Sequence, residues 1–212
     1  MIINQQNLRN LFIGYRAAFQ NAFAGVQPDF NQFVLTVTSG NASEQYGWLG
    51  NSTAFREWLG DRVIQNLGVH DYTIKNKTFE NTVGVSSRRA HSKTTADGLF
   101  TPLMGQLGQD SAMHPAELVY ALLSGGFTQT CYDGQYFFDT DHPVTSAAGN
   151  EVSVSNFQGG SGTPWFLLDT TRIMKPLILQ KRKDYNFVTM DAEKDENVFM
   201  RKGVRIRRLT RA

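Results

Sequence analysis

The sequence predicts a fold of the α+β class, in which helices and strands occupy separate stretches of one chain. Residues 7–23 carry apolar side chains at spacings of three and four, and residues 102–124 form a longer, mostly apolar helical stretch. Residues 71–80 instead alternate between two faces, which is typical of a half-buried strand. With 212 residues, the chain is long enough for one or two domains and a sizeable core.

The first helix is expected over residues 7–23, because its apolar residues form one continuous stripe. They are Leu8, Leu11, Phe12, Tyr15, Ala18, Phe19 and Ala22. Gly25 and Pro28 end this helix. A short strand or extended arm is expected at residues 33–38, before the turn residues 39–41.

The stretch from Tyr46 to Val85 is the one around which the chain is organised. It opens with two Trp-Leu-Gly repeats, at residues 48–50 and 58–60, and closes with the alternating run at 71–80. A ribbon of this length, with Trp and Arg exposed along it, needs a partner to cover it. We expect that partner to be another copy of the chain, because Trp, Tyr and Arg anchor protein interfaces. The candidate inter-subunit contacts are Trp48, Phe55, Arg56, Trp58, Arg62, Tyr72, Lys75 and Lys77.

The second helix has clear signals at both ends. Thr101-Pro102 supplies an N-cap and a proline at the first helical position. His114-Pro115 interrupts or kinks the helix, because proline removes a backbone donor, and Gly125-Gly126 ends it. The preceding residues, 86–95, are polar, basic and without pattern, which indicates a flexible loop.

The rest of the chain is predicted to consist of turns and strands. Asp133-Gly134 is a hairpin turn signal between aromatic β segments, and residues 145–162 are small and polar, as in a surface loop. The further strand candidates are residues 165–168, 177–180 and 185–189, followed by an acidic turn or short helix at 191–196.

The distribution of charge gives no support for a nucleic-acid-binding domain outside the tail. The last twelve residues hold six basic side chains and no acidic one, whereas the remainder holds 15 Lys and Arg against 19 Asp and Glu. The net charge of +2 therefore combines a mildly acidic body with a basic tail. No apolar run approaches the roughly 20 residues of a membrane span, and the N-terminus lacks a secretory signal. The single cysteine, Cys131, excludes an internal disulfide framework and suits a reducing cytosol.

The most tempting cluster for chemistry is formed by Cys131, Asp139, Asp141 and His142. A thiol, an imidazole and carboxylates leave two alternatives open, a cysteine-dependent hydrolase and a divalent metal site. The stronger interpretation is a turn, because Asp141 directly precedes His142-Pro143 and an aspartate there caps its own backbone. We therefore predict no catalytic residue, no cofactor and no metal ligand.

Several long runs carry a resemblance to a known family. They are YGWLG, FREWLGDRVIQNLGVHDYTIKNKTFE, HPAELVYALLSGGF, CYDGQYFFDTDHPV and PWFLLDTTRIMKPLILQKRKDYNFVTMDAEKDENVFMRK. These runs resemble the major head subunit (gpT) family of Mu-like bacteriophages and prophages. The resemblance covers nearly everything from the N-terminal helix to Lys202.

This resemblance implies the capsid fold that tailed phages share with encapsulins. Residues 1–45 would then form an N-terminal helix and arm, residues 46–97 an extended β-hairpin loop, and residues 98–127 the spine helix of a peripheral domain. Residues 128–200 would form the axial domain and remaining peripheral strands, and residues 201–212 a basic, aberrant tail.

The function implied is that of a major capsid protein, which self-assembles into capsomers and an icosahedral head. The implied partners are other copies of the chain, a scaffold, a head protease and enclosed double-stranded DNA bound without sequence specificity, with no membrane. The implied location is the virion, and the bacterial host cytoplasm before assembly. An encapsulin-like protein shell and the hydrolase mentioned above are the alternatives.

The chain departs from the family pattern at Ser86 to Thr95 and again after Lys202. The family pattern has an acidic, structured segment at the first place and further strands at the second. These departures suggest a decayed prophage copy with frameshifts at both places. On that hypothesis the peripheral sheet lacks its closing strands and leaves an edge unpaired, the terminus is disordered or aberrant, and assembly is defective.

Overall fold

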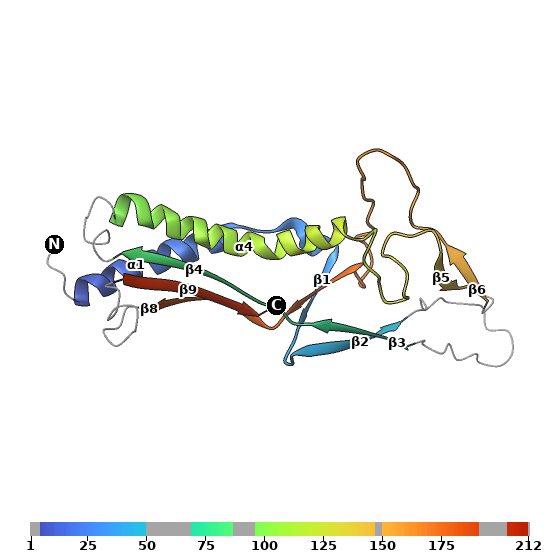
Figure 1. Ribbon diagram of the computed structural model, residues 1–212, viewed down its shortest axis with the longest axis horizontal. Helices are drawn as coiled ribbons and strands as arrows, with labels where there is room; N and C mark the ends of the chain where they lie inside the picture. The colour runs from blue at the N-terminus through green and yellow to red at the C-terminus, as the bar shows by residue number, and fades with distance from the viewer. Residues whose placement is uncertain (1–4, 50–68, 87–95, 147–149, 191–202, 212) are drawn as a thin grey trace. The chain divides into compact units, whose positions relative to one another are not determined.

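The computed structural model describes residues 5–49, 69–86, 96–146, 150–190 and 203–211 (Figure 1). The chain divides into two units. Unit 1 contains Met1–Gly40, Asn76–Val119 and Asp169–Ala212, and unit 2 contains Asn41–Lys75 and Tyr120–Leu168.

Unit 1 is built on two helices that the apolar periodicity predicted to within two residues at each end. They are α1 (Gln5–Gly25) and α4 (Thr101–Ser124), whose last residues belong to unit 2. A π-helical turn, η2 (Ala96–Phe100), leads into α4, and Pro115 lies inside that helix without ending it. A 3-10 turn, η1 (Asp29–Gln32), follows α1 and buries Phe30.

A three-stranded antiparallel sheet packs beside these helices (Figure 1). Its strands are β4 (Thr78–Ser86), β9 (Gly203–Arg211) and β8 (Lys183–Met190), with β9 in the middle. The core between helices and sheet consists of Phe12, Tyr15, Phe19, Val85, Phe100, Met104, Leu107 and Phe187. Tyr15 and Met104 are completely buried, so the apolar stripe of α1 faces this core as its spacing predicted.

The position of β9 corrects the expectation of a disordered C-terminal tail outside the sheet. Thr78 to Ser86 pair with residues 211 to 203, and Lys183 to Met190 pair with the other edge of the same strand. The physical reason is that both β4 and β8 present backbone donors and acceptors that a strand between them satisfies. The sequence did contain a signal for it, since Val204 and Ile206 alternate with Arg205 and Arg207.

The two helices approach closely at Gly108. A β-carbon at this position would overlap the backbone carbonyl of Phe19 in α1. Glycine therefore allows the backbone of α4 to contact that of α1 directly, which brings the flanking residues Met104 and Leu107 into the core.

A second, two-stranded sheet in unit 1 joins β1 (Val34–Thr38) to β7 (Leu177–Lys181) in parallel. These strands confirm the predicted segments 33–38 and 177–180. Parallel pairing requires a long crossover, and here it joins segments more than 130 residues apart, with Val34 opposite Leu177.

Unit 2 contains two antiparallel hairpins. The first pairs β2 (Ser43–Leu49) with β3 (Val69–Lys75), and the second pairs β5 (His142–Thr145) with β6 (Glu151–Val154). The β5–β6 hairpin was not predicted, because residues 145–162 read as a loop. Residues 165–168, predicted to be a strand, contain none.

Five phenylalanines form a cluster of ring contacts in the second half of unit 2. Phe138 is their centre, with its ring centroid 5.0 Å from that of Phe127 and 5.2 Å from that of Phe166. Phe157 makes an edge-to-face contact with Phe127, with ring centroids 5.6 Å apart. These contacts stabilise the loops that carry the rings, because tilted, offset and edge-to-face aromatic pairs are favourable.

Candidate assembly surface and the Cys131 cluster

The β2–β3 hairpin is the part of the predicted ribbon that the structure describes. Tyr46 lies opposite Tyr72, and Trp48 lies opposite His70. The Tyr72 side chain is 37% exposed, and Lys75 and Lys77 are also exposed. Burial, followed by the neighbouring Glu44 carboxylate, raises the pKa of the partly covered Tyr46. The hairpin therefore presents aromatic and basic side chains to solvent.

Four of the predicted contacts, Phe55, Arg56, Trp58 and Arg62, lie outside the described residues. Trp48 is described only by its strand position in β2. The predicted strand at 71–80 is in fact divided: β3 ends at Lys75, and β4 begins at Thr78 with a different partner strand. The role of all eight residues as inter-subunit contacts stays a prediction.

A hydrogen-bonded clasp in unit 1 closes the base of this hairpin. The Asn76 amide donates to Ser39 Oγ over 2.9 Å, and the Gln180 amide donates to Asn76 Oδ1 over 2.7 Å. Ser39 and Gln180 are 3% and 4% exposed, so these bonds are largely protected from water. Since Ser39 precedes the outgoing limb and Asn76 follows the returning one, the clasp fixes both ends of the hairpin.

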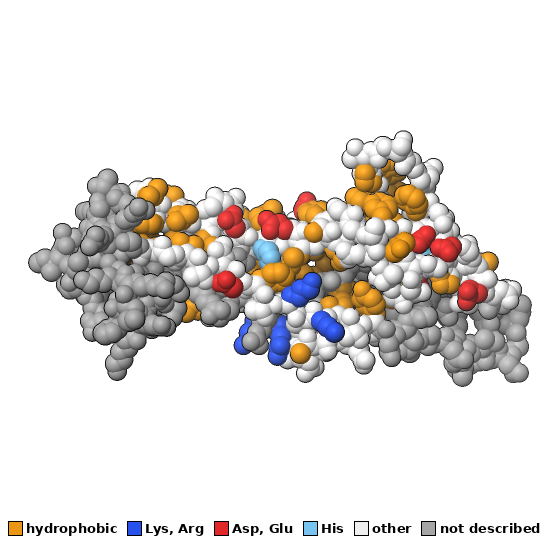
Figure 2. Space-filling model, in the orientation of Figure 1, with side chains coloured by type: hydrophobic (Ala, Val, Ile, Leu, Met, Phe, Trp, Pro, Cys, Tyr) orange, Lys and Arg blue, Asp and Glu red, His pale blue; other side chains and the backbone are white. Residues whose placement is uncertain are grey.

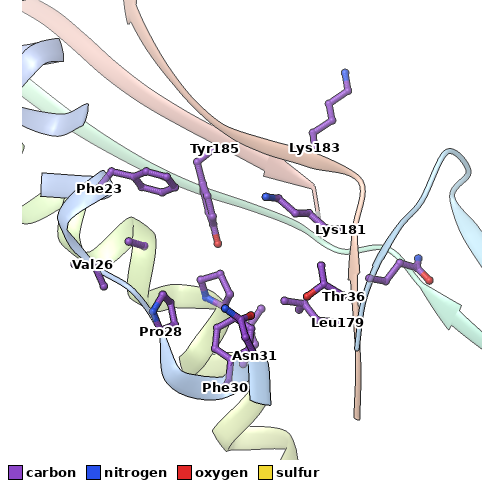
Figure 3. A pocket seen from close by; sticks show the side chains of 14 residues that line it. Phe23, Val26, Pro28, Phe30, Asn31, Thr36, Leu179, Lys181, Lys183 and Tyr185 are labelled. Atoms are coloured by element: carbon purple, nitrogen blue, oxygen red, sulfur yellow. The ribbon is translucent and has the colours of Figure 1, made fainter. Parts of the chain in front are cut away.

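A cavity of about 300 Å³ opens in unit 1 between α1, α4 and the strands β7 and β8 (Figure 3). Phe23, Pro28 and Phe30 line one side, and Tyr185 and Lys181 face them from the strands. The Tyr185 hydroxyl is 3.1 Å from His114 Nδ1, which ties β8 to α4 beside the cavity. The walls are mainly apolar and contain no paired acid and base, so they indicate packing rather than chemistry.

Each unit exposes large apolar side chains in an irregular segment of its chain. In unit 2, Trp165 is 76% exposed and Leu167 is 86% exposed; in unit 1, Ile173 is 91% exposed. From the sequence, residues 165–168 were interpreted as a strand candidate, and Trp165, Leu167 and Ile173 were not identified as surface residues. On the described part of the face in Figure 2, Lys and Arg gather in one small area and acidic side chains are scattered.

The Cys131 cluster is organised by a residue that the sequence interpretation did not include. The Asp133 carboxylate lies between the other two groups: the Cys131 thiol donates to Oδ1 over 2.8 Å, and His142 Nδ1 is 2.7 Å from Oδ2. Asp139 and Asp141 point elsewhere, since Asp139 accepts from the Tyr136 amide and Asp141 from the Gln135 side chain. Asp133 was overlooked because Asp-Gly was interpreted only as a turn.

The local backbone explains why these groups meet. Gly134 adopts a φ of +87°, which favours glycine, and its amide donates to the Cys131 carbonyl over 3.2 Å. The Gln135 amide donates to Asp133 Oδ1 over 3.0 Å, so the turn itself directs the carboxylate inward. His142 then enters from the first position of β5.

The protonation states in this cluster do not suit a cysteine nucleophile. Burial, followed by the hydrogen bond to Asp133, raises the pKa of the Cys131 thiol to about 11. Burial alone would raise the pKa of Asp133, but hydrogen bonds from Cys131, His142 and the Gln135 amide lower it below its usual value. The thiol is thus neutral at pH 7 and bonded to a carboxylate rather than to an imidazole base, the reverse of an activated nucleophile.

The chain matches, over residues 8–211, the family described as Mu-like prophage major head subunit gpT. The major capsid protein of Escherichia phage Mu is 39% identical over 206 residues, which cover 94% of this chain and 67% of that protein. The Mu-like prophage FluMu major head subunit of Haemophilus influenzae is 37% identical over 201 residues, covering 92% of this chain and 65% of that protein. This chain therefore spans about two thirds of the length of these curated relatives.

Solved structures agree on the fold. A chain of the procapsid of bacteriophage JBD30 is 40% identical, with a TM-score of 0.77 over 99% of this chain and 72% of that chain. A chain of the JBD30 capsid is 32% identical, with a TM-score of 0.64 over 91% of this chain and 63% of that chain. The predicted α+β fold of the tailed-phage capsid type is thereby confirmed. None of the helices in the described residues has the length and apolarity to cross a membrane.

Proposed function

Because this chain belongs to the Mu-like prophage major head subunit gpT family, we propose that it assembles with copies of itself into capsomers and an icosahedral head. The observation that carries the proposal is the likeness to the JBD30 procapsid chain, with a TM-score of 0.77 over 99% of this chain. In such a shell the contacts are heterologous and close by rotation, so two different surfaces of one subunit must be complementary.

We propose the β2–β3 hairpin and its continuation as one of these two surfaces. A two-stranded hairpin is marginally stable alone; this one exposes Tyr72 and Lys75, and Lys77, two residues after β3, is exposed as well. The clasp formed by Ser39, Asn76 and Gln180 supports the same role, since it links the chain segments that directly precede β2 and follow β3. A neighbouring subunit beneath the hairpin would bury the aromatic face and pair the lysines.

The partners proposed beyond the chain itself are double-stranded DNA, a scaffold and a head protease. Contact with DNA would be without sequence specificity, through phosphates alone. A structural role also accounts for the Cys131 cluster better than a hydrolase does, because the thiol is neutral and lacks a histidine base. We accordingly propose that the chain has no catalytic activity.

Electron microscopy of the purified full chain tests assembly. Capsomers or closed shells are expected, whereas monomers at every concentration and ionic strength would contradict the proposal. Nucleic-acid absorbance of purified shells then separates a DNA-filled head from an encapsulin-like shell, which would contain protein cargo.

The double variant Lys75→Glu/Lys77→Glu tests the hairpin surface. It should abolish shells in micrographs and in sedimentation while leaving the circular dichroism of the subunit unchanged. Arg9→Glu/Arg16→Glu on the exposed face of α1 changes the net charge equally and is the matched control. If both variants assemble as the parent chain does, or both fail equally, the hairpin is not the specific contact.

A further inference from the structure

The Asp133 carboxylate is buried, and the His142 ring is the only basic side chain among its described partners. Its side chain is 5% exposed, and its neighbours are a thiol, a backbone amide and the His142 ring, itself 13% exposed. Buried carboxylates in proteins are paired with cations or coordinate metal ions, because leaving the charge unpaired is costly.

The surrounding sequence offers no lysine or arginine that could pair with the Asp133 carboxylate. Residues 120–168 contain four acidic residues and neither lysine nor arginine. Among the described residues, His142 is the only ion-pair partner of Asp133. This stretch therefore attracts cations, and a soluble cation does not compete with a lysine or arginine from these residues for the carboxylate.

The three side chains also converge as metal ligands do. Cys131 Sγ, a carboxylate oxygen of Asp133 and a ring nitrogen of His142 all lie within 4.8 Å of one another. Bond lengths of about 2.0–2.3 Å at a tetrahedral zinc ion place ligand atoms about 3.4–3.7 Å apart. The observed contacts of 2.7 and 2.8 Å to Asp133 would need to lengthen by only about 1 Å to admit the ion.

We propose that Cys131, Asp133 and His142 bind a borderline-soft divalent cation, of which Zn²⁺ is the best match. One thiolate, one imidazole and one carboxylate together favour zinc over the hard cations Mg²⁺ and Ca²⁺, which take oxygen ligands. Cys131 is half-buried, so an ion can enter and a water molecule can complete the tetrahedron. The site would join the Cys131–Gly134 turn to β5 without depending on shell formation.

Binding of the metal ion releases one proton from the site. The Cys131 thiol loses its proton to solvent and forms the metal–sulfur bond, while Asp133 contributes a carboxylate that is already ionised. When His142 Nδ1 binds the ion, the ring carries its proton on Nε2. No oxidant, reductant or other reactant takes part.

Cobalt substitution tests the site directly. The full chain is freed of metal with a chelator and titrated with Co²⁺, whose bond to a thiolate gives a near-ultraviolet charge-transfer band. One equivalent should develop the band, and Zn²⁺ should bleach it. Absence of the band in the correctly folded parent chain overturns the proposal, whether or not the chain assembles.

Matched variants separate this site from adventitious binding. Cys131→Ser should abolish the band, and Asp133→Asn should weaken Co²⁺ binding at least tenfold. Asp139→Asn and Asp141→Asn remove nearby carboxylates that bond elsewhere, and should leave the titration unchanged. Equal midpoints for the Asp133 variant and these two controls would also overturn the proposal. Circular dichroism confirms that each variant is folded.

Discussion

Gln180 in β7 donates a 2.7 Å hydrogen bond to Asn76, 104 residues earlier, at the point where the chain returns from the β2–β3 hairpin. This bond connects the parallel β1–β7 pair to the start of β4. It also explains why the alternating stretch at residues 71–80 breaks after Lys75, because the Asn76 side chain is committed to Ser39 and Gln180.

Replacing Asn76 with alanine is therefore expected to destabilise unit 1. The buried Gln180 amide would lose its acceptor, which costs about 1–3 kcal/mol. Chemical denaturation followed by circular dichroism measures the change. Asn81→Ala, at an exposed position of β4, is the control and should change stability by less than about 0.5 kcal/mol. Equal losses in the two variants would show that the clasp does not stabilise the unit.

The contact between Gly108 and Phe19 predicts opposite changes in stability when two glycines of α4 are replaced by alanine. Gly108→Ala places a β-carbon against the backbone carbonyl of Phe19, which cannot move aside as a side chain could. The overlap should cost about 1–3 kcal/mol. Gly105→Ala in the same helix meets only the Ala22 β-carbon, at 4.0 Å, and should stabilise α4 by up to about 1 kcal/mol. Thermal melts of both variants measure these changes. A stabilising Gly108→Ala would contradict the close approach of the α4 backbone to that of α1.

The phenylalanine cluster in unit 2 predicts a local loss of stability. Phe138→Ala removes ring contacts to Phe127, Phe137 and Phe166, and should cost up to about 3–5 kcal/mol. The loss should also raise hydrogen exchange in residues 127–166 more than in α1. Tyr136→Ala nearby removes a ring that is 45% exposed, and serves as the comparison. Exchange that rises uniformly over the chain would argue against a separate cluster.

The neutral thiol of Cys131 predicts slow alkylation in metal-free protein. Since only the thiolate reacts and the pKa of this thiol is raised to about 11, its alkylation rate at pH 8 should be well below that of an ordinary cysteine. The rate should rise through pH 10, and Asp133→Asn should increase it at pH 8 by removing the neighbouring charge. Rapid alkylation of the parent chain at pH 7 would instead favour the nucleophile required by a hydrolase.

The sequence predicted those elements whose residues face a core. The stripe containing Phe12 and Phe19 predicted α1, and the run at 185–189 predicted β8, since Phe187 is buried. The sequence did not predict strands that bury neither face. Strand β6 is exposed throughout, and Val152 and Val154 are each nearly half exposed. The apolar periodicity of β6 therefore carries no information about its structure. Its partner β5 was missed for the same reason.

Long-range partners were equally inaccessible to local reasoning. Nothing near Asp133 in the sequence indicates that His142 will meet its carboxylate, because the meeting depends on how β5 leaves the intervening loop. The arginine-rich residues 203–211 were interpreted by composition rather than by the alternation of Val204 and Ile206. The pairing of β1 with β7 likewise depends on tertiary context.

The central place of β9 also sets the order in which the subunit can fold. Val85 pairs with Val204, 119 residues further along, so β4 leaves the ribosome long before its neighbour exists. Until then β4 and β8 both expose open edges beside the apolar stripe of α1, a state that is slow to resolve and prone to intermolecular pairing. Pairing of β9 with both strands is therefore the step that covers the edges of β4 and β8 that face each other across the sheet. Rapid pairing of β9 would therefore shorten the time in which the open edges can pair with other copies of the chain.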